Sequence, residues 1–280
     1  MESLRGKTAV VTGAASGMGL AFGRRFGQAG MHVVLADIER TALDSAVSAL
    51  RCEGISVQGV VTDVSSGASM EALLDGALTA FEQVNVVCLN AGVTGGTGRS
   101  WALSEADWQW TLGVNLWGVI HGIRVFVPHL LTHDDGHVVT TASIAGHLSS
   151  PYGSPYNVSK HGAVTITETL QLELEREKST IGVTLLCPGF VNTNIIDSDR
   201  NRPTELGETV RDDRGSRWLE MSRRALANGK APEEVANMVH DAVLAKQFYL
   251  FTDEMWNAPI SQRHAEILER RPPTLGLPTR

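Results

Sequence analysis

The residues of this sequence best suited to chemistry are a tyrosine and a lysine one helical turn apart. Tyr156 and Lys160 open a predicted helix over 154–178, and Ser143 precedes them by 13 and 17 residues. A phenol is a poor base at neutral pH because its ordinary pKa is about 10. A nearby ammonium, together with the positive charge of an oxidised nicotinamide, favours the phenolate, and bringing that pKa to about 7 takes roughly 4 kcal/mol of electrostatic preference. The pair predicts a group that exchanges a proton with a ligand, although a lone pair at this spacing is more often a surface contact.

A glycine-rich turn stands near the start of the chain, between a predicted strand over 8–11 and a predicted helix over 17–29. Glycines there let the backbone approach a pyrophosphate, and the helix N-terminus presents free N–H groups and a positive dipole end. The order strand, glycine turn, helix predicts a dinucleotide site, whereas the glycines alone would indicate only a tight turn. The predicted cofactor contacts in this turn are Gly13, Ser16, Gly17, Met18 and Gly19.

Asp37 ends the second predicted strand, 18 residues after Gly19. A carboxylate at this place accepts hydrogen bonds from both hydroxyls of the adenosine ribose and repels the extra phosphate of NADP. No lysine or arginine stands at Ser16 or Ile38 to attract that phosphate, and Arg40 is the nearest cation in sequence. The charge pattern therefore favours NAD over NADP.

The elements that must position these residues alternate along the chain. Runs rich in β-branched residues, nearly continuous in apolar side chains, are typical of parallel strands covered on both faces. They are followed by longer segments with helical spacing, and no linker divides the chain. We therefore expect an α/β fold: a single Rossmann-type domain with a doubly wound parallel sheet of about seven strands. The predicted strands are 8–11, 32–36, 57–61, 84–89, 137–141, 183–186 and 248–251, and the predicted helices are 17–29, 40–53, 69–81, 105–131, 154–178 and 232–245.

The composition of 42% hydrophobic and 20% charged residues is that of an ordinary globular protein. The formal net charge of −7 argues against nucleic acid or an anionic membrane as the main partner. Residues 1–7 lack the apolar stretch of a signal peptide, so a cytoplasmic location is expected. Polar residues interrupt the apolar run 112–131, which predicts a helix buried between protein layers rather than a membrane span.

The three cysteines, Cys52, Cys88 and Cys187, are not spaced as metal ligands, and no metal site is predicted. We expect them to be buried thiols in a reducing compartment.

Two segments break the alternation of strands and helices. Residues 192–230, the charged segment, combine many acidic and basic residues with a few apolar anchors. Residues from about 252 to 280 form the C-terminal extension, and its tail from Arg271 contains three prolines and should be extended. The first is expected to act as a substrate lid and the second as a surface strap, with a solvated loop as the alternative for each.

These motifs together resemble the short-chain dehydrogenase/reductase family, in its short single-domain branch, from about Lys7 to Phe251. Thr12–Gly19 is similar to the family's Thr-Gly-x-x-x-Gly-x-Gly turn. Further matches are the adenine-contacting pair Asp63-Val64, the Asn90-Ala91-Gly92 motif, the catalytic tetrad Asn115, Ser143, Tyr156 and Lys160, and the nicotinamide-holding segment with Pro188, Gly189, Val191 and Thr193.

The resemblance implies a role for each member of the tetrad. Tyr156 is the general base in oxidation and the general acid in reduction, and Ser143 polarises the substrate oxygen. Lys160 holds the nicotinamide ribose and lowers the pKa of the tyrosine. Asn115 supports a water in a proton relay from that lysine. Tyr156 and Lys160 are thus also cofactor contacts.

The sequence points to a small, hydrophobic secondary alcohol or ketone as the substrate, because the residues expected around it are mostly apolar or aromatic. Those residues are Ile144, Ala145, Tyr152 and Phe190. The resemblance also implies a homotetramer or homodimer. The main alternative is a non-catalytic NAD-binding sensor on the same fold; a sugar-nucleotide epimerase would usually need a longer C-terminal domain.

Overall fold

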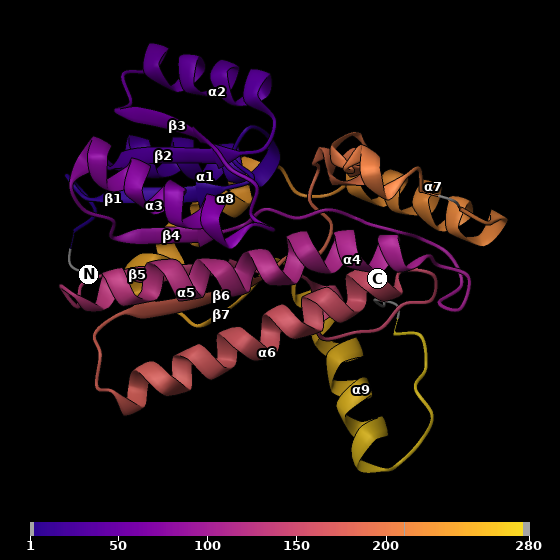
Figure 1. Ribbon diagram of the computed structural model, residues 1–280. Coiled ribbons are helices and arrows are strands. Elements are labelled where there is room, and N and C mark those ends of the chain that lie inside the picture. The colour runs from indigo at the N-terminus through magenta and orange to yellow at the C-terminus, as the bar shows by residue number, and fades with distance from the viewer. Residues whose placement is uncertain (1–2, 210, 277–280) are drawn as a thin grey trace.

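The computed structural model describes residues 3–209 and 211–276. Seven parallel strands form one sheet in the order β3-β2-β1-β4-β5-β6-β7 (Figure 1). Every predicted strand is confirmed within two residues of its expected bounds. The chain reverses its direction of progress across the sheet between β1 and β4, and ligands of such sheets bind beyond the carboxyl ends of the strands at this point. The strands are β1 Thr8–Thr12, β2 His32–Asp37, β3 Val57–Val61, β4 Val86–Leu89, β5 His137–Thr141, β6 Gly182–Cys187 and β7 Tyr249–Phe251.

Helices cover both faces of the sheet, which explains why the strands are apolar on both sides. Ala9 and Val11 face one buried cluster, and Val10 between them faces the other. One face carries α1 Gly17–Gln28, α2 Arg40–Cys52 and α8 Pro232–Ala245; the other carries α3 Gly67–Phe81, α5 Gly118–Leu131 and α6 Ser154–Arg176.

The helix predicted over 105–131 is not a regular α-helix. It consists of α4 Glu105–Leu112, a π-helical turn over Gly113–Trp117, and α5. The stretch is long and apolar enough to span a membrane by composition, and 39% of the apolar window is buried within the chain. Phe126 is buried against the sheet, whereas Trp117 is 49% exposed, so only one side of this helix lies between protein layers.

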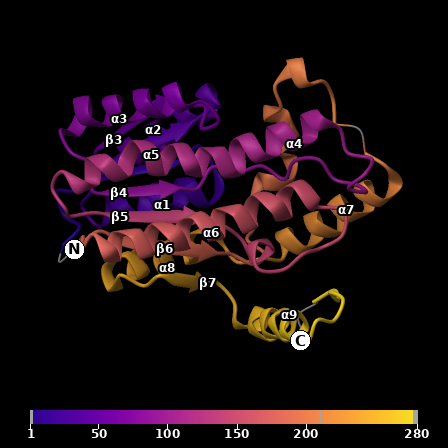
Figure 2. The same ribbon diagram turned by 60° about the horizontal axis from the view of Figure 1, so that its bottom comes forward.

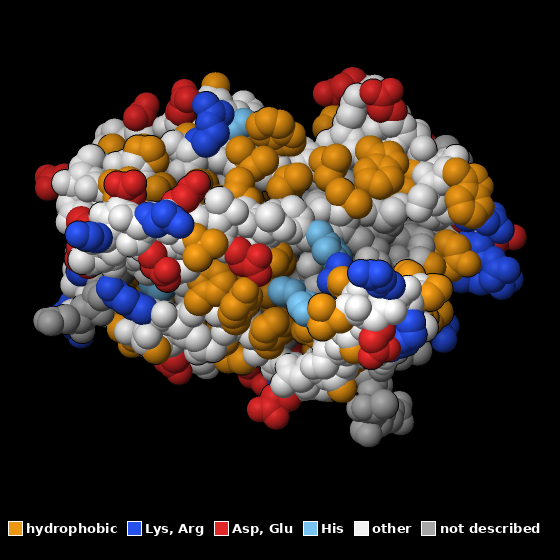
Figure 3. Space-filling view, turned by 90° about the horizontal axis from the view of Figure 1, so that it is seen from below, with side chains coloured by type: hydrophobic (Ala, Val, Ile, Leu, Met, Phe, Trp, Pro, Cys, Tyr) orange, Lys and Arg blue, Asp and Glu red, His pale blue; other side chains and the backbone are white. Residues whose placement is uncertain are grey.

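The face that carries α5 and α6 leaves apolar side chains exposed, and Figure 3 shows such side chains gathered among charged ones. Val158 and Leu172 on α6 are 48% and 61% exposed. This face fits the predicted contact between subunits, which stays a prediction.

The charged segment is structured rather than a solvated loop. It contains the 3-10 helices η3 Asn194–Asn201 and η4 Thr204–Leu206, followed by α7 Asp213–Ala227. Figure 1 shows it beyond one end of the sheet, on the side of the carboxyl ends.

The C-terminal extension begins with η5 Glu254–Trp256 and α9 Asn257–Leu268, for which the sequence carried no prediction, and the described chain from residue 271 is irregular, as expected. Figure 2 shows α9 standing off from the sheet and its covering helices. The buried Glu266 accepts hydrogen bonds from Thr274 and Gln262, which folds the chain back onto α9. Residues 277–280 of this extension lie outside the described residues.

The cysteine prediction holds for two of the three thiols. Cys88 on β4 and Cys187 on β6 are buried in the sheet, whereas Cys52 is exposed because it ends α2 at the surface.

Candidate active site

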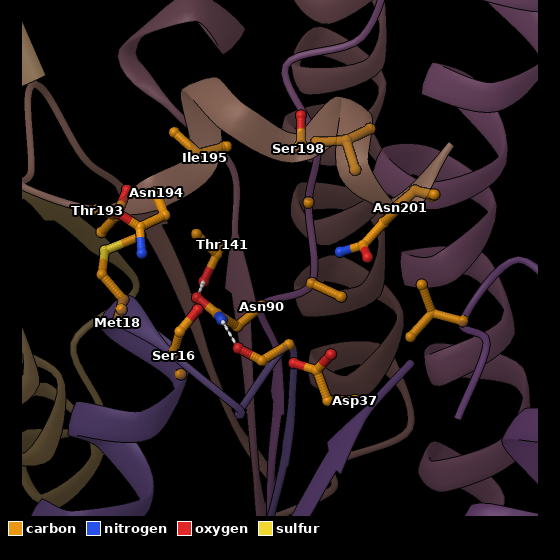
Figure 4. Close-up of a pocket in the computed structure, with 18 of the residues that line it drawn as sticks. Ser16, Met18, Asp37, Asn90, Thr141, Thr193, Asn194, Ile195, Ser198 and Asn201 are labelled. Atoms are coloured by element: carbon orange, nitrogen blue, oxygen red, sulfur yellow. Dashed lines mark hydrogen bonds between the residues drawn. The ribbon is translucent and has the colours of Figure 1, made fainter. Parts of the chain in front are cut away.

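One cavity opens at the carboxyl ends of the strands, between the glycine turn and the charged segment. Figure 4 shows Ser16, Met18 and Asp37 on one side of it, and Asn194, Ile195 and Ser198 on the other. All seventeen residues predicted to contact a cofactor line this single cavity, together with Ser143. They come from six separate stretches of chain, so the structure brings together what the sequence only lists in order.

The glycine turn leaves the start of α1 open to a ligand. Gly13 and Gly17 have φ angles of +63° and +53°, which favour glycine. A Cβ on Gly19 would lie 2.1 Å from the carbonyl oxygen of Gly13, so only glycine lets the turn close this tightly. Within the described chain, no side chain caps the first turn of α1. Its N–H groups are therefore available to an anion such as a pyrophosphate.

The Asp37 carboxylate is held by two backbone N–H groups, one from the glycine turn and one from the loop after β2. Its Oδ2 accepts a hydrogen bond from the N–H of Ala15 at 2.9 Å, and its Oδ1 accepts one from the N–H of Glu39 at 3.0 Å. Each carboxylate oxygen can accept a further bond. The carboxylate therefore suits a pair of ribose hydroxyls.

Asn90 links the glycine turn to the strand that precedes Ser143. Its Nδ2 donates to the carbonyl of Thr12 at 3.1 Å, and its Oδ1 accepts from the hydroxyl of Thr141 at 3.2 Å (Figure 4). This side chain therefore holds the ends of β1, β4 and β5 in register around the cavity.

The proposed proton-transfer group lies at the inner end of the cavity. Lys160 Nζ is 5.7 Å from the centre of the Tyr156 ring and donates to the carbonyl of Thr141 at 2.9 Å. Ser143 lies at the end of β5 and is hydrogen-bonded to Tyr156. The phenol, the ammonium and the serine hydroxyl thus meet as their spacing predicted.

Burial dominates the electrostatics of this group. Desolvation raises the pKa of Tyr156 above its ordinary value, and the hydrogen bond from Ser143 opposes this only in part. Desolvation also lowers the pKa of Lys160 to about 8. In the protein without cofactor the pKa of Tyr156 therefore lies above its ordinary value. The predicted lowering by Lys160 together with the oxidised nicotinamide stays a prediction.

Asn115 does not line the cavity; it is fully buried behind it, in the π-helical turn. Its Oδ1 accepts from the N–H of Val93 at 2.8 Å, and its Nδ2 donates to the carbonyl of Val93 at 2.9 Å and to Ser159 Oγ at 3.1 Å. Ser159 Oγ in turn donates to the carbonyl of Tyr156 at 2.7 Å. The side chain therefore ties the loop after β4 to the helix that carries the tyrosine.

The apolar residues that line the cavity differ from the predicted substrate set. Ile144, Ala145, Tyr152 and Phe190 are not part of the cavity lining, and they stay predictions for contacts outside it. The lining is instead formed by Val93, Trp110, Val114, Ile195 and Leu226.

Ile195 and Leu226 belong to the charged segment, which was expected to cover the substrate, but Trp110 and Val114 were missed because they reach the site only through the tertiary fold. Their spacing, four residues apart on one helical face, was the available signal. Trp110 is only 5% exposed, so it packs in the core and also faces the cavity.

Comparisons with known proteins agree with this geometry. A family model described as short chain dehydrogenase matches residues 7–204. The crystal structure of a short chain dehydrogenase/reductase from Burkholderia phymatum in complex with NAD is similar, with a TM-score of 0.96, 42% identity and coverage of 99% of each chain.

Two curated proteins are also similar to most of the chain. The 1-deoxy-11-beta-hydroxypentalenate dehydrogenase of Streptomyces avermitilis is 34% identical over 255 residues, which cover 89% of this chain and 86% of its own. The C alpha-dehydrogenase of a Sphingobium species is 30% identical over 253 residues, covering 89% of this chain and 81% of its own.

Proposed function

The chain belongs to the short-chain dehydrogenase/reductase family, and from this premise we propose that it transfers a hydride between NAD and a secondary alcohol or ketone. The observation that carries the proposal is the cavity itself, in which the phenol of Tyr156, the hydroxyl of Ser143 and the open start of α1 line one space.

The lining fits a dinucleotide along its whole length. The N–H groups at the start of α1 suit the pyrophosphate, and Asp37 suits the adenosine ribose. When bound, the cofactor supplies the nicotinamide ring that accepts or gives the hydride. The ring's positive charge in the oxidised form is also the second cation that the buried phenol lacks.

Side chains of the protein transfer the proton. In oxidation, Tyr156 as phenolate accepts the proton of the substrate hydroxyl; in reduction, the phenol returns a proton to the carbonyl oxygen. Ser143 donates a hydrogen bond to the same oxygen and polarises it. Lys160, oriented by the carbonyl of Thr141, stabilises the phenolate. Asn115 holds the Tyr156 helix in place through Ser159.

The substrate is proposed to be hydrophobic, because Trp110, Val114 and Ile195 form an apolar wall in the same cavity as the phenol. The charged segment contributes Ile195 and Leu226 to this wall, which supports a role as substrate lid. A cytoplasmic location and a homodimer or homotetramer remain predictions.

Turnover by a Tyr156→Phe variant tests the proposal. With NAD and a panel of hydrophobic secondary alcohols, followed by NADH absorbance, the loss of the general base should reduce turnover about a thousandfold. NADH should bind the variant as it binds the unmodified protein. Tyr249→Phe is the matched control. The Tyr249 hydroxyl donates to the Glu168 carboxylate, and Tyr249 does not line the cavity. Normal turnover by Tyr156→Phe would refute the role of Tyr156 as general base. If both proteins bind NADH and no panel member reacts with either, the sensor alternative replaces the enzyme.

The choice of NAD over NADP is proposed from the charge of Asp37. Fluorescence titration should show tighter binding of NADH than of NADPH, and the reverse order would refute the assignment of Asp37.

A further inference from the structure

An ion pair crosses the mouth of the cofactor cavity at its adenosine end. Arg200, in η3 of the charged segment, donates to Glu39 Oε1 from Nη2 at 2.7 Å and from Nε at 3.1 Å. Asn201 Nδ2 donates to the same oxygen at 2.8 Å. Glu39 is two residues beyond Asp37, and its N–H is bonded to the Asp37 carboxylate. The guanidinium is thus held beside the residue assigned to the adenosine ribose.

Arg200 is one of two cationic residues in the described lining of the cavity. Of the described residues that line it, Lys160 and Arg200 are the cations. Lys160 is engaged at the inner end with Thr141, so Arg200 is the cation available at the adenosine end. The hydrogen bond from Arg200 holds the pKa of Glu39 below its usual value, so the partner carboxylate stays charged. As long as the ion pair is formed, the guanidinium of Arg200 is bonded to Glu39 and is not available to another anion.

The 2′-phosphate that distinguishes NADP carries about −1.5 to −2 charges at pH 7, and a guanidinium binds such an anion in the same forked geometry that it uses for a carboxylate. Arg200 and Glu39 have 41% and 29% of their side chains exposed, and pairs this exposed stabilise a protein little. The guanidinium can therefore exchange partners at small cost once its carboxylate is removed.

Resting on the function proposed above, we propose that Glu39 is a second determinant of cofactor choice. It withholds Arg200 from a 2′-phosphate, while Asp37 receives the ribose hydroxyls of NAD. Rejection of NADP thus depends on a contact between the charged segment and the loop after β2, and not on Asp37 alone.

A double-mutant cycle tests this inference. Dissociation constants of NADH and NADPH are measured by fluorescence titration for the unmodified protein, Glu39→Gln, Arg200→Gln and the double variant. In Glu39→Gln, NADPH should bind about tenfold more tightly, because the freed guanidinium gains a charge-assisted partner. NADH affinity should change by no more than about twofold. In the double variant the gain for NADPH should disappear.

Arg223→Gln is the matched control, because this arginine of α7 pairs with Asp197 and does not line the cavity. It should leave the ratio of the two affinities unchanged. The inference is overturned if Glu39→Gln does not tighten NADPH, if the gain persists without Arg200, or if Arg223→Gln produces the same shift. A protein that binds neither nucleotide would instead refute the proposed function, so the two failures are distinguishable.

Discussion

The glycine turn and the charged segment face each other across one cavity, yet they are held by different forces. Around the glycine turn, β1 is buried along its whole length and the fold depends on apolar packing and close backbone approach. The charged segment is held largely by side-chain charges, and its helix α7 leaves Met221 72% exposed. Among its described residues the ion pairs are Arg200–Glu39, Arg202–Asp107, Arg211–Asp199, Arg223–Asp197, Arg99–Asp212, Arg224–Glu220 and Lys230–Asp253.

One of these pairs differs from the rest, because it is buried. The side chains of Arg202 and Asp107 are 4% and 2% exposed, and the guanidinium lies 5.4 Å from the ring of Trp110. The exposed pairs contribute little each. This contact therefore anchors the charged segment to α4, while pairs such as Arg200–Glu39 remain adjustable. The comparison teaches that a glycine turn fixed by apolar packing can be combined with a segment that has buried anchors, such as Arg202 and Ser198, and exposed ion pairs that can exchange partners.

Breaking the anchor should have the largest effect. Asp107→Asn leaves the Arg202 charge buried without a counter-charge, which should cost about 3 kcal/mol. Hydrogen exchange of amides in η3 and η4 should become about a hundredfold faster, while amides of the sheet keep their protection. Arg224→Gln, which breaks an exposed pair with Glu220, is the control and should cost less than about 0.5 kcal/mol. Equal effects of the two variants would contradict the distinction between the anchor and the exposed pairs.

In the glycine turn, NADH affinity should depend on steric fit rather than on charge. In Gly19→Ala the added Cβ meets the carbonyl oxygen of Gly13, and the turn must widen. The resulting strain should weaken NADH binding about a hundredfold, measured by fluorescence titration. Exchange in η3 should stay unchanged. Gly76→Ala on α3 is the control, because its Cβ would lie 3.3 Å from Val60, away from the cavity. Normal NADH affinity in Gly19→Ala would show that the turn does not hold the nucleotide.

The sheet and the ion pairs should lose stability in different pH ranges. Burial of His137 on β5 lowers its pKa to about 3. Its Nε2 must donate to Thr184, whose hydroxyl itself donates to the carbonyl of Gln247. Its buried Nδ1 has no hydrogen-bond partner among the described residues, so a proton there would be unpaired and the ring is neutral in the folded protein.

The unfolded chain therefore binds the extra proton first, and the full stabilisation is present above about pH 6.5 and is lost as the pH falls toward 3. By pH 5 the free energy of unfolding should fall by about 2 kcal/mol. The pKa values of Glu39 and Asp197 are lowered by their arginines, so those pairs should persist until the pH falls below the ordinary carboxyl range of about 4.

Urea unfolding at pH 7 and pH 5 measures this difference. His137→Gln keeps an N–H donor for Thr184 without a titrating ring, and should lose the part of the pH dependence that His137 supplies. A variant as sensitive to acid as the unmodified protein would show that other groups carry the effect.

The sequence sufficed for those parts of the molecule that depend on local pattern. The strands, the turn around Gly17 and the place of Asp37 follow from short-range spacing, and the Tyr156–Lys160 pair needs only one helical turn. The contact of Arg202 with Asp107 joins residues 95 positions apart, and the local sequence around neither residue predicts it. The same is true of Trp110 in the cavity wall. The rise in the Tyr156 pKa in the protein without cofactor could not be read from the sequence either, because burial is a property of the whole fold.

The central claim is that Tyr156 acts on a substrate held against NAD in this cavity. A crystal structure of the protein with NAD and an unreactive alcohol analogue tests it most directly. The analogue oxygen should lie within about 3.2 Å of the hydroxyls of Tyr156 and Ser143, with its carbon about 3.5 Å from C4 of the nicotinamide ring. A Tyr156 hydroxyl turned away from C4, or NAD bound outside the cavity, would contradict the account.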